Sequence, residues 1–384
     1  MTSLERLVPV DEQAELEPFD STQDLILNMG PQHPSTHGVL RLVLRLRGER
    51  VLKCTPIIGY LHRGIEKILE NRTYLQGIRY TDQFEYISNM LNEHAYTGAI
   101  EALLGVEVPR RAEYIRVIVD ELSRCSAHLV GVGTYVLDLG AWTPVTYAFR
   151  EREQILDFFE ELGGGRFNHN YFRPGGVLYD LPPGWLSRLE KFLNGFEKTI
   201  DELDELVTGN EIFRARTVGV GVIPQDMAVA YGLSGPNIRG SGVPFDMRTY
   251  RPYSAYEELE PRVQVRFSGD CYSRYEVRML EMREAIRLCR LAMANLPGGP
   301  IQARLPHVIR PPKGEAYYTV EGAKGDLSVY MVSDGVSPNP YRAKVRGPSF
   351  VNLQILPELV KGCTMADVVA ILGSIDIVLG EVDR

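Results

Sequence analysis

Closely spaced cysteine pairs are missing from this sequence. Its five cysteines are scattered along the chain, and no two have the CxxC spacing that many zinc and iron–sulfur sites use. An odd number with wide spacing fits a reducing compartment better than a disulfide framework. Cys125 and Cys289 fall within apolar helical patterns, where we expect them to be buried as small apolar side chains.

A long apolar run and an excess of positive charge are also absent. No segment approaches the roughly 18–20 apolar residues that a membrane-spanning helix needs, and the N-terminus has no basic-then-apolar signal. We therefore expect a cytoplasmic protein, or one held on a membrane by its partners. The net charge of −8 argues against a nucleic-acid partner, because binding phosphates requires a basic surface.

Several motifs of well-known enzyme classes are missing as well. The sequence has no GxGxxG, no P-loop and no GxSxG. The glycine run at 163–165 lacks the lysine and hydroxyl that a phosphate-binding loop requires. These absences leave no motif-based evidence for a nucleotide site or a serine hydrolase.

What the sequence does contain is helical and strand periodicity along most of its 384 residues. Residues 1–22 are predicted to form a flexible or partner-bound N-terminal arm, and residues 23–384 a single domain. Within it we expect a small antiparallel sheet in 23–60, a bundle of long helices in 61–297 and a mixed β and helical region in 298–384. The predicted fold class is α+β, mainly helical.

Individual elements follow from the same patterns. Helices are expected near 63–78 and 83–104, and at 109–138, 147–162, 185–207 and 275–296. Several of them are long enough to build a bundle. Near the C-terminus, 314–320 and 325–335 are expected to pair as a β-hairpin, 341–347 to add a strand, and two short helices to close the chain.

Residues 30–42, GPQHPSTHGVLRL, hold two histidines four positions apart, His33 and His37. The prolines and glycines of this stretch disfavour a helix, so we expect a loop. On a loop the two imidazoles can cap backbone groups, contribute to a metal site or donate protons near neutral pH. A metal site needs further ligands, and no Cys, Asp or Glu is near in sequence. The spacing alone does not decide between the three roles.

Two further polar side chains are candidates for a site. Tyr86 belongs to a group of tyrosines in residues 80–96, where such a stripe most often packs in the core with its hydroxyl solvated. Asp138 lies among apolar residues at the end of the helix expected at 109–138, and a buried carboxylate there needs a histidine or arginine partner. From these patterns alone the chain is a helical protein with a candidate His, Tyr and Asp site.

Five stretches together carry a resemblance to a known family. They are GPQHPSTHGVLRL (30–42), GYLHRGIEK (59–67), RTYLQGI (72–78), RGPSFVNLQ (346–354) and GEVDR (380–384). From about Leu25 to Arg384 the chain resembles the 49 kDa component, also called the D subunit, of respiratory complex I. The resemblance implies a fold like that of the nickel–iron hydrogenase large subunit. It also implies a quinone-site component of a proton-translocating NADH:quinone oxidoreductase, in which quinone reduction is coupled to proton translocation.

Comparison with the nickel–iron hydrogenases indicates which ligands this chain has lost. Arg63 and Glu66 keep the hydrogenases' early arginine-glycine-x-glutamate motif, but the cysteine pair that follows it there is absent. Near the C-terminus Asp376 survives, while Val378 and Glu381 occupy the two cysteine positions. Without these thiols nickel cannot be bound by four thiolates, so we exclude a working hydrogenase and expect no metal. The resemblance implies that a quinone headgroup uses the cavity instead.

The resemblance also implies roles for individual residues. Tyr86 and His37 are expected to be the hydrogen-bond donors to the quinone headgroup, and Asp138 the carboxylate partner of that histidine. His33 is expected either to line the quinone pocket or to serve the structure of the loop. Arg63 is expected beside the 4Fe–4S cluster of a neighbouring subunit, because this chain itself carries no cofactor motif.

Partners and location are expectations from the same resemblance. The chain should contact the small iron–sulfur component (the PSST-like B subunit), a 30 kDa-like C subunit, an H-like membrane component, and an I-like ferredoxin component. It should lie peripherally on the cytoplasmic side of the cell membrane. Two alternatives remain open: the equivalent component of a related complex fed by F420H2 or ferredoxin, and a purely structural scaffold.

Overall fold

The computed structural model describes residues 20, 23–33 and 38–384. The predicted N-terminal arm, residues 1–22, therefore lies outside the described residues except for Asp20. The second histidine of the 30–42 stretch, His37, also lies outside them, whereas His33 is described.

An antiparallel three-stranded sheet forms the N-terminal part of the described chain, as predicted. It consists of β1 (Asp24–Met29), β2 (Arg41–Arg47) and β3 (Arg50–Ile57), in that order. Along β2 the buried leucines Leu42, Leu44 and Leu46 alternate with partly exposed residues. This period of two lets one face of the sheet pack on the core while the other meets solvent.

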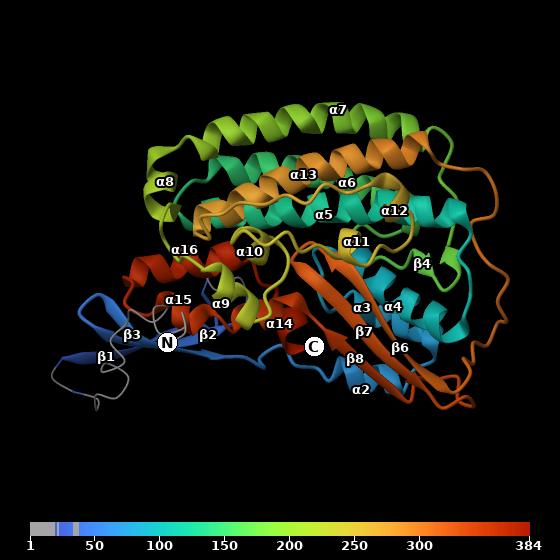
Figure 1. Ribbon diagram of the computed structural model, residues 1–384, viewed down its shortest axis with the longest axis horizontal. Helices are drawn as coiled ribbons and strands as arrows, with labels where there is room; N and C mark the ends of the chain where they lie inside the picture. Colours follow the sequence, from blue (N-terminus) through green and yellow to red (C-terminus); the bar gives the residue numbers. More distant parts are fainter. Residues whose placement is uncertain (1–19, 21–22, 34–37) are drawn as a thin grey trace.

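Four long helices form a bundle in the upper half of Figure 1: α5 (Arg110–Asp138), α6 (Thr143–Gly163), α7 (Trp185–Leu203) and α13 (Cys271–Ala294). Helix α5 contacts α6 and α13, and α7 contacts the same two helices. Their starts follow from sequence: Pro144 lies in the first turn of α6, and the Asp270 carboxylate caps α13 by accepting a hydrogen bond from Ser273 N at 2.8 Å. The four long helices predicted in this region are confirmed, with shifted ends; a short π-helix, η3 (Asp204–Thr208), follows α7.

Two of the other predicted helices are wrong in extent. In place of one helix at 63–78 the structure has α2 (Ile65–Glu70) and α3 (Tyr74–Thr81), because Thr73 begins a new helix through a capping box with Gln76. In place of a helix over 83–104, residues 82–88 form turns and α4 (Asn89–Leu104) begins after them. The turn segment 82–88 carries Tyr86.

Short elements connect the long helices. They are β4 (Phe172–Arg173), β5 (Gly176–Val177), α8 (Glu211–Thr217), α9 (Gln225–Ala230), α10 (Pro236–Arg239), α11 (Met247–Tyr250) and α12 (Tyr256–Leu259). Strands β4 and β5 pair with each other. Helix α10 contacts α13, and α11 contacts the C-terminal sheet, so this connection links the two parts of the molecule.

The C-terminal region begins with a second antiparallel sheet. Its strands β6 (Gly314–Gly322), β7 (Gly325–Ser333) and β8 (Arg342–Arg346) pair in that order, which confirms the predicted hairpin and third strand. Strands β6 and β7 lie against α4 (Figure 1). Only two residues, Ala323 and Lys324, separate β6 from β7 at the tip of the hairpin.

Four helices, rather than the two predicted, close the chain: α14 (Pro348–Leu353), α15 (Leu356–Val360), α16 (Met365–Ile375) and α17 (Leu379–Asp383). The prediction was wrong because local signals divide the segment. Gly362, with a φ of 77°, follows α15, and Thr364 begins α16 through a capping box with Asp367.

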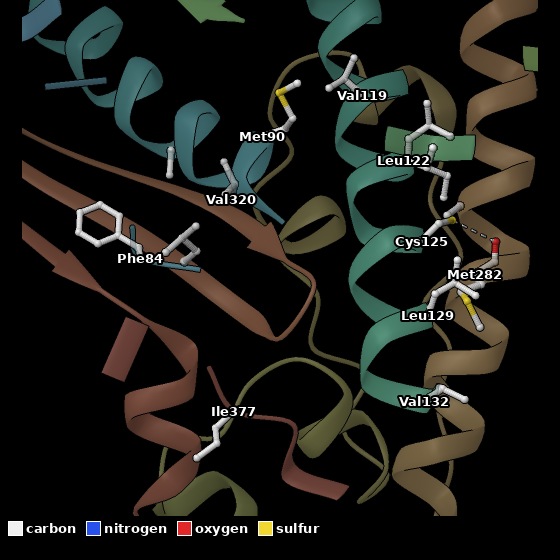
Figure 2. Packing of buried hydrophobic residues seen from close by; sticks show 14 of the residues in the cluster. Phe84, Met90, Val119, Leu122, Cys125, Leu129, Val132, Met282, Val320 and Ile377 are labelled. Atoms are coloured by element: carbon white, nitrogen blue, oxygen red, sulfur yellow. Dashed lines mark hydrogen bonds between the residues drawn. The ribbon is translucent and has the colours of Figure 1, made fainter. Parts of the chain in front are cut away.

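One continuous cluster of buried apolar side chains joins the bundle to the C-terminal region (Figure 2). Cys125 on α5 belongs to it, and so do Phe84, Val320 and Ile377 from three separate segments. Cys125 and Cys289 are buried, as predicted. Because Phe84 is anchored in this core, the turn segment 82–88 is fixed against both the hairpin and the C-terminal helices.

Candidate functional site

Tyr86 lies half-buried in the turn segment between α3 and α4. Its ring centroid is 6.5 Å from that of Phe167, a side chain that is largely exposed. The ring also meets α17 at Gly380, where an added Cβ would lie 2.6 Å from the carbonyl oxygen of Phe84 and 3.4 Å from the Tyr86 ring. Only glycine permits this close approach, so the C-terminal segment packs directly against the turn that carries Tyr86.

The phenol of Tyr86 is a hydrogen-bond donor at physiological pH. Burial raises its pKa, the charge of Glu85 raises it further, and Lys324 opposes the shift. The hydroxyl therefore keeps its proton, as a donor to an incoming oxygen must.

Two buried charged groups, Glu85 and Lys324, act on Tyr86, and Lys324 connects them to further buried charges. Lys324 Nζ lies 2.8 Å from Oδ1 of Asp376, and Arg278 Nε lies 3.4 Å from Oδ2 of the same carboxylate. Burial alone would raise the pKa of Asp376, but Lys324 and Arg278 lower it to about 2. The buried carboxyls of Glu85 and Glu381 complete the group. We call Glu85, Arg278, Lys324, Asp376 and Glu381 the Tyr86 cluster.

Lys324 belongs to this cluster because the tip of the β6–β7 hairpin is buried, where most hairpin tips are exposed. Asn352 Nδ2 donates to the Lys324 carbonyl at 3.1 Å, and the Asp326 amide donates to Ser234 Oγ at 3.1 Å. An added Cβ on Gly235 would lie 2.4 Å from the Lys324 carbonyl oxygen. These contacts hold the tip inside the molecule and direct the ammonium group to Asp376.

Asp376 reaches the cluster from an uncommon backbone conformation. It follows the last residue of α16 with a φ of 59°, in the left-handed region that aspartate adopts more readily than most residues other than glycine. Its carboxylate lies so close to α5 that a Cβ on Gly131 would be 2.7 Å from Oδ2. The position of this side chain therefore depends on both the helix end and a glycine on α5.

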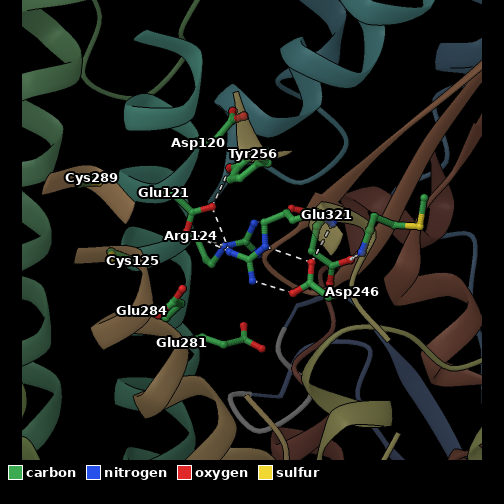
Figure 3. A network of polar contacts seen from close by, with 12 residues as sticks. Asp120, Glu121, Arg124, Cys125, Asp246, Tyr256, Glu281, Glu284, Cys289 and Glu321 are labelled. Atoms are coloured by element: carbon green, nitrogen blue, oxygen red, sulfur yellow. Dashed lines mark hydrogen bonds and ion pairs between the residues drawn. The ribbon is translucent and has the colours of Figure 1, made fainter. Parts of the chain in front are cut away.

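A second and larger group of buried charges lies between α5, α13 and the hairpin (Figure 3). Arg248 binds Glu121 and Asp246, with nitrogen–oxygen distances of 3.0 and 2.7 Å. Arg239 binds Glu281 and Glu321, both at 2.7 Å. Its members, which we call the bundle cluster, are Glu121, Arg124, Arg239, Asp246, Arg248, Glu281 and Glu321.

His128 on α5 lies at the edge of the bundle cluster. Its Nε2 is 2.8 Å from Oε2 of Glu281. Burial lowers the pKa of His128, and the nearby arginines add to this effect against the attraction of Glu281. The protonated form of His128 would attract Asp376 as well as Glu281.

His33 is exposed and lines a pocket of about 660 Å³ between the N-terminal sheet and α16. The lining is mainly apolar, with Leu27 and Met29 from β1 and Val369 from α16. Neither Tyr86 nor Asp138 lines this pocket, so the structure does not bring His33 together with them there.

The other predicted site residues lie on separate elements. Asp138 is the last residue of α5 and is partly buried. Arg63 is exposed just before α2, where it lines a surface pocket of about 480 Å³ with Lys67 and Arg72. His37 falls outside the described residues, so its position relative to Tyr86 and Asp138 stays a prediction.

The residues that sequence reasoning missed are the buried charges next to Tyr86. Glu85 and Lys324 were not candidates, because an acid beside an aromatic and a lysine in a two-residue turn are ordinary surface features. Asp376 and Glu381 were noted only as counterparts of hydrogenase positions. The one available signal was the position of Glu85 directly before Tyr86.

Two general properties of the described residues bear on function. Among them, no group of three or more His, Cys, Asp or Glu side chains is arranged to hold a metal ion. None of the helices in the described part of the chain has both the length and the apolarity needed to cross a bilayer.

Comparison with known proteins gives matches along nearly the whole chain. A family model described as respiratory-chain NADH dehydrogenase, 49 Kd subunit, matches residues 138–313 and 303–384. The D subunit of NADH-quinone oxidoreductase from Desulforamulus reducens is 52% identical, covering 94% of this chain and 99% of the relative. Proteins of the same name from Clostridium beijerinckii and Geobacillus thermodenitrificans are each 50% identical over 94% of this chain, and 98% and 99% of their own lengths are covered.

Proposed function

The chain belongs to the 49 kDa family of respiratory-chain NADH dehydrogenase subunits, and on this premise we propose that it forms part of the quinone-headgroup pocket of a complex I-type membrane oxidoreductase. Its relatives are named as the D subunit of NADH-quinone oxidoreductase, so NADH is the proposed electron source for the assembled complex. Quinone reduction in that complex is proposed to drive proton translocation.

The observation that carries this proposal is the environment of Tyr86. Its phenol keeps its proton, its half-buried ring lies near Phe167 and Gly380, and the buried charges of Glu85 and Lys324 act on it. Reducing a quinone takes two electrons and two protons, and the protons must arrive at the two carbonyl oxygens. A phenol at the edge of a charged interior is suited to donating a hydrogen bond and then a proton to one of them.

The remaining site residues are assigned as part of the same proposal. His37 donates to the second carbonyl oxygen, and Asp138 favours the protonated form of that imidazole. Asp138 ends α5, where the negative end of the helix dipole adds to its attraction for a cation. His33 contributes to the lining of the quinone pocket.

Electrons reach the quinone from outside this chain. We propose that the neighbouring small iron–sulfur component, the PSST-like B subunit, supplies them from a 4Fe–4S cluster, and that this chain binds no cofactor of its own. Arg63 is proposed to lie near that cluster, where an exposed cation can stabilise the reduced form. The C-like, H-like and I-like components of complex I are the other proposed partners, and the chain is proposed to lie peripherally on the cytoplasmic side of the membrane.

Isolation of the complex through a tag on this chain tests the proposal. We expect co-isolation of an iron–sulfur subunit and membrane subunits, with NADH:quinone reductase activity. If the complex oxidises F420H2 or reduced ferredoxin but not NADH, the proposed electron donor is wrong and must be replaced by the one that is oxidised. If the complex assembles with the Tyr86→Phe variant and reduces quinone at the wild-type rate, only a scaffold role remains for this chain.

A further inference from the structure

Glu85 is a buried carboxyl group with one oxygen left without a hydrogen bond. The side chain is 3% exposed, and its Oε2 accepts a hydrogen bond from Ser88 N at 3.0 Å. Its Oε1 is buried and has no hydrogen-bond partner in the described part of the chain. An anion in this position is costly, because Oε1 is buried without a hydrogen bond from the described residues and the Ile87 backbone N–H offsets only part of the cost of burial. A neutral carboxylic acid fits the same site with less cost.

Charged groups from four other elements act on this carboxyl group. Lys324 comes from the hairpin tip, Asp376 from the end of α16, Glu381 from α17 and Arg152 from α6. Burial raises the pKa of Glu85 to about 7, with Glu381 and Asp376 adding to the rise and Lys324 opposing it. Near neutral pH the side chain therefore exists in both its acid and its carboxylate forms.

The neighbouring carboxyl groups are less suited to storing a proton for Tyr86. Asp376 is bound by Lys324 and Arg278 and remains ionised, with its pKa lowered to about 2. Burial raises the pKa of Glu381 as well, but Ser349 opposes this rise with hydrogen bonds from both its side chain and its backbone N–H, the latter to Oε2 at 2.9 Å. Glu85 differs from both, because it directly precedes Tyr86 and its charge acts on the phenol. Asp376 Oδ2 also lacks a hydrogen bond among the described residues, but Lys324 and Arg278 hold that carboxyl group ionised, whereas the pKa of Glu85 is raised.

We propose that Glu85 is the proton reservoir that reprotonates Tyr86 during quinone reduction, a role that rests on the proposed function. Two electrons from the partner's cluster and two protons convert the quinone to the quinol. One O–H bond breaks at the Tyr86 hydroxyl as an O–H bond forms on the reduced headgroup. The resulting phenolate takes a proton from the Glu85 carboxylic acid through a bridging water, because neither Glu85 oxygen is hydrogen-bonded to the Tyr86 hydroxyl in the described chain, and Glu85 becomes a carboxylate. Lys324 stabilises that carboxylate until water supplies the next proton.

The first test is the pH dependence of turnover in Glu85→Gln, measured on the assembled complex in membranes. Glutamine keeps the shape but carries no exchangeable acid proton. At pH 6, where Glu85 holds its proton, we expect kcat for quinone reduction to fall roughly tenfold to hundredfold, with KM unchanged. At pH 8.5, where the wild-type reservoir is empty, the two rates should approach each other. A loss equal at both pH values, or no loss, would overturn the proposal.

Glu93→Gln is the matched control. Glu93 is also fully buried with its pKa raised to about 7, but Asn89, Tyr171 and Phe172 donate hydrogen bonds to its two oxygens. We expect its variant to keep the wild-type pH profile. A pH-dependent loss as large as that of Glu85→Gln would show that burial alone causes the effect, and would overturn the assignment.

Infrared spectroscopy gives a readout that does not depend on turnover. The wild-type complex should show a protonated carboxyl band that titrates near pH 7 and is missing in Glu85→Gln. If Glu85→Gln does not assemble, Glu85→Asp should assemble and keep both a titrating band and a pH-dependent rate. Loss of either would contradict the role of Glu85 as a proton reservoir.

Tyr86→Phe separates the two proposals. If Tyr86→Phe is inactive while Glu85→Gln behaves as wild type, only the proposal for Glu85 fails. If Tyr86→Phe is fully active, the proposed quinone site fails too.

Discussion

The two buried charge clusters differ in how completely their carboxylates are hydrogen-bonded. In the bundle cluster, Glu121 accepts from Arg248 and Tyr256, and both oxygens of Glu321 are bound, by Arg239 and by Met247 N. In the Tyr86 cluster, Glu85 Oε1 and Asp376 Oδ2 have no hydrogen bond among the described residues. Both clusters bury charged groups, but only the Tyr86 cluster has carboxylate oxygens that accept no hydrogen bond from the described residues.

This difference separates a structural role from a chemical one. Hydrogen bonds to both oxygens of a buried carboxylate tie its elements together. They do not by themselves fix its protonation state, because burial raises the pKa of Glu321 to about 7 although both of its oxygens are bound. A buried carboxyl group with an unbound oxygen can gain and lose a proton at a smaller cost in structure. The bundle cluster therefore connects α5 to the 239–248 segment and the hairpin, while the Tyr86 cluster is the one that we propose takes part in proton transfer.

Arg248→Met should give the largest effect and tests the structural half of the comparison. It leaves Asp246 and Glu121 buried with less counter-charge, which should cost about 3–5 kcal/mol of stability. We expect little assembled complex in membranes and a lowered thermal midpoint. Arg283→Met is the matched control, since Arg283 pairs with Asp201 and Asp204 on the surface and should cost about 1 kcal/mol or less. Equal losses in the two variants would contradict the account.

The pH dependence of stability tests the chemical half. Glu85 has a folded pKa of about 7 against 4.5 for the free side chain, so the folded state binds more protons between these values. Its contribution to stability is complete below pH 4.5 and is lost as the pH rises to 7, by about 3 kcal/mol. Glu85→Gln removes this contribution. As the pH rises from 4.5 to 7, the free energy of unfolding of the variant should therefore increase relative to that of the wild type by about 3 kcal/mol. Thermal denaturation at several pH values measures it, and parallel curves would contradict the shift.

Asp138→Asn should have a smaller effect, on the pH profile of quinone reduction. The variant keeps the shape of the side chain but removes the negative charge that favours protonated His37. The fall in rate with rising pH should then begin about half a unit to one unit lower than in the wild type. Asp180→Asn, at an exposed carboxylate bound by Arg111, should leave the profile unchanged. Superimposed profiles for Asp138→Asn and the wild type would remove Asp138 from proton delivery.

His33→Gln should have the smallest effect. The side chain is exposed, and the pocket that it lines includes neither Tyr86 nor a residue of the Tyr86 cluster. We expect KM for quinone to rise by no more than about threefold and kcat to stay within the same factor, as for other exposed contacts. A loss of kcat comparable to that of Tyr86→Phe would make His33 a donor rather than a lining residue.

The long helices and both sheets were predictable because apolar periodicity reflects burial over many residues. The break at Asn71–Thr73 and the turn segment 82–88 were not, because they depend on local capping at Thr73 and on contacts of Phe84 with distant segments. A prediction from periodicity joins such neighbouring helices, since the short interruption hardly changes the apolar pattern.

The candidate site was predictable only in part. Tyr86 was identified through family motifs, but the charges beside it were not. Lys324 is buried because Asn352 and Gly235 draw the hairpin tip inward, and Asp376 reaches it from a left-handed backbone conformation at the end of α16. These contacts join positions far apart in the sequence, and nothing in the local pattern distinguishes such a lysine from one in a solvated turn.

Turnover of Tyr86→Phe in the assembled complex tests the central claim most directly. The substitution removes one hydroxyl, and losing that donor should raise the barrier by about 2–4 kcal/mol, roughly a 30- to 1000-fold loss of quinone reduction. NADH oxidation with an artificial acceptor that bypasses the quinone site should stay normal. Tyr96→Phe is the control, because its hydroxyl is buried without a hydrogen-bond partner in the described chain, and it should keep full activity. Quinone reduction near the wild-type rate in Tyr86→Phe would contradict the account.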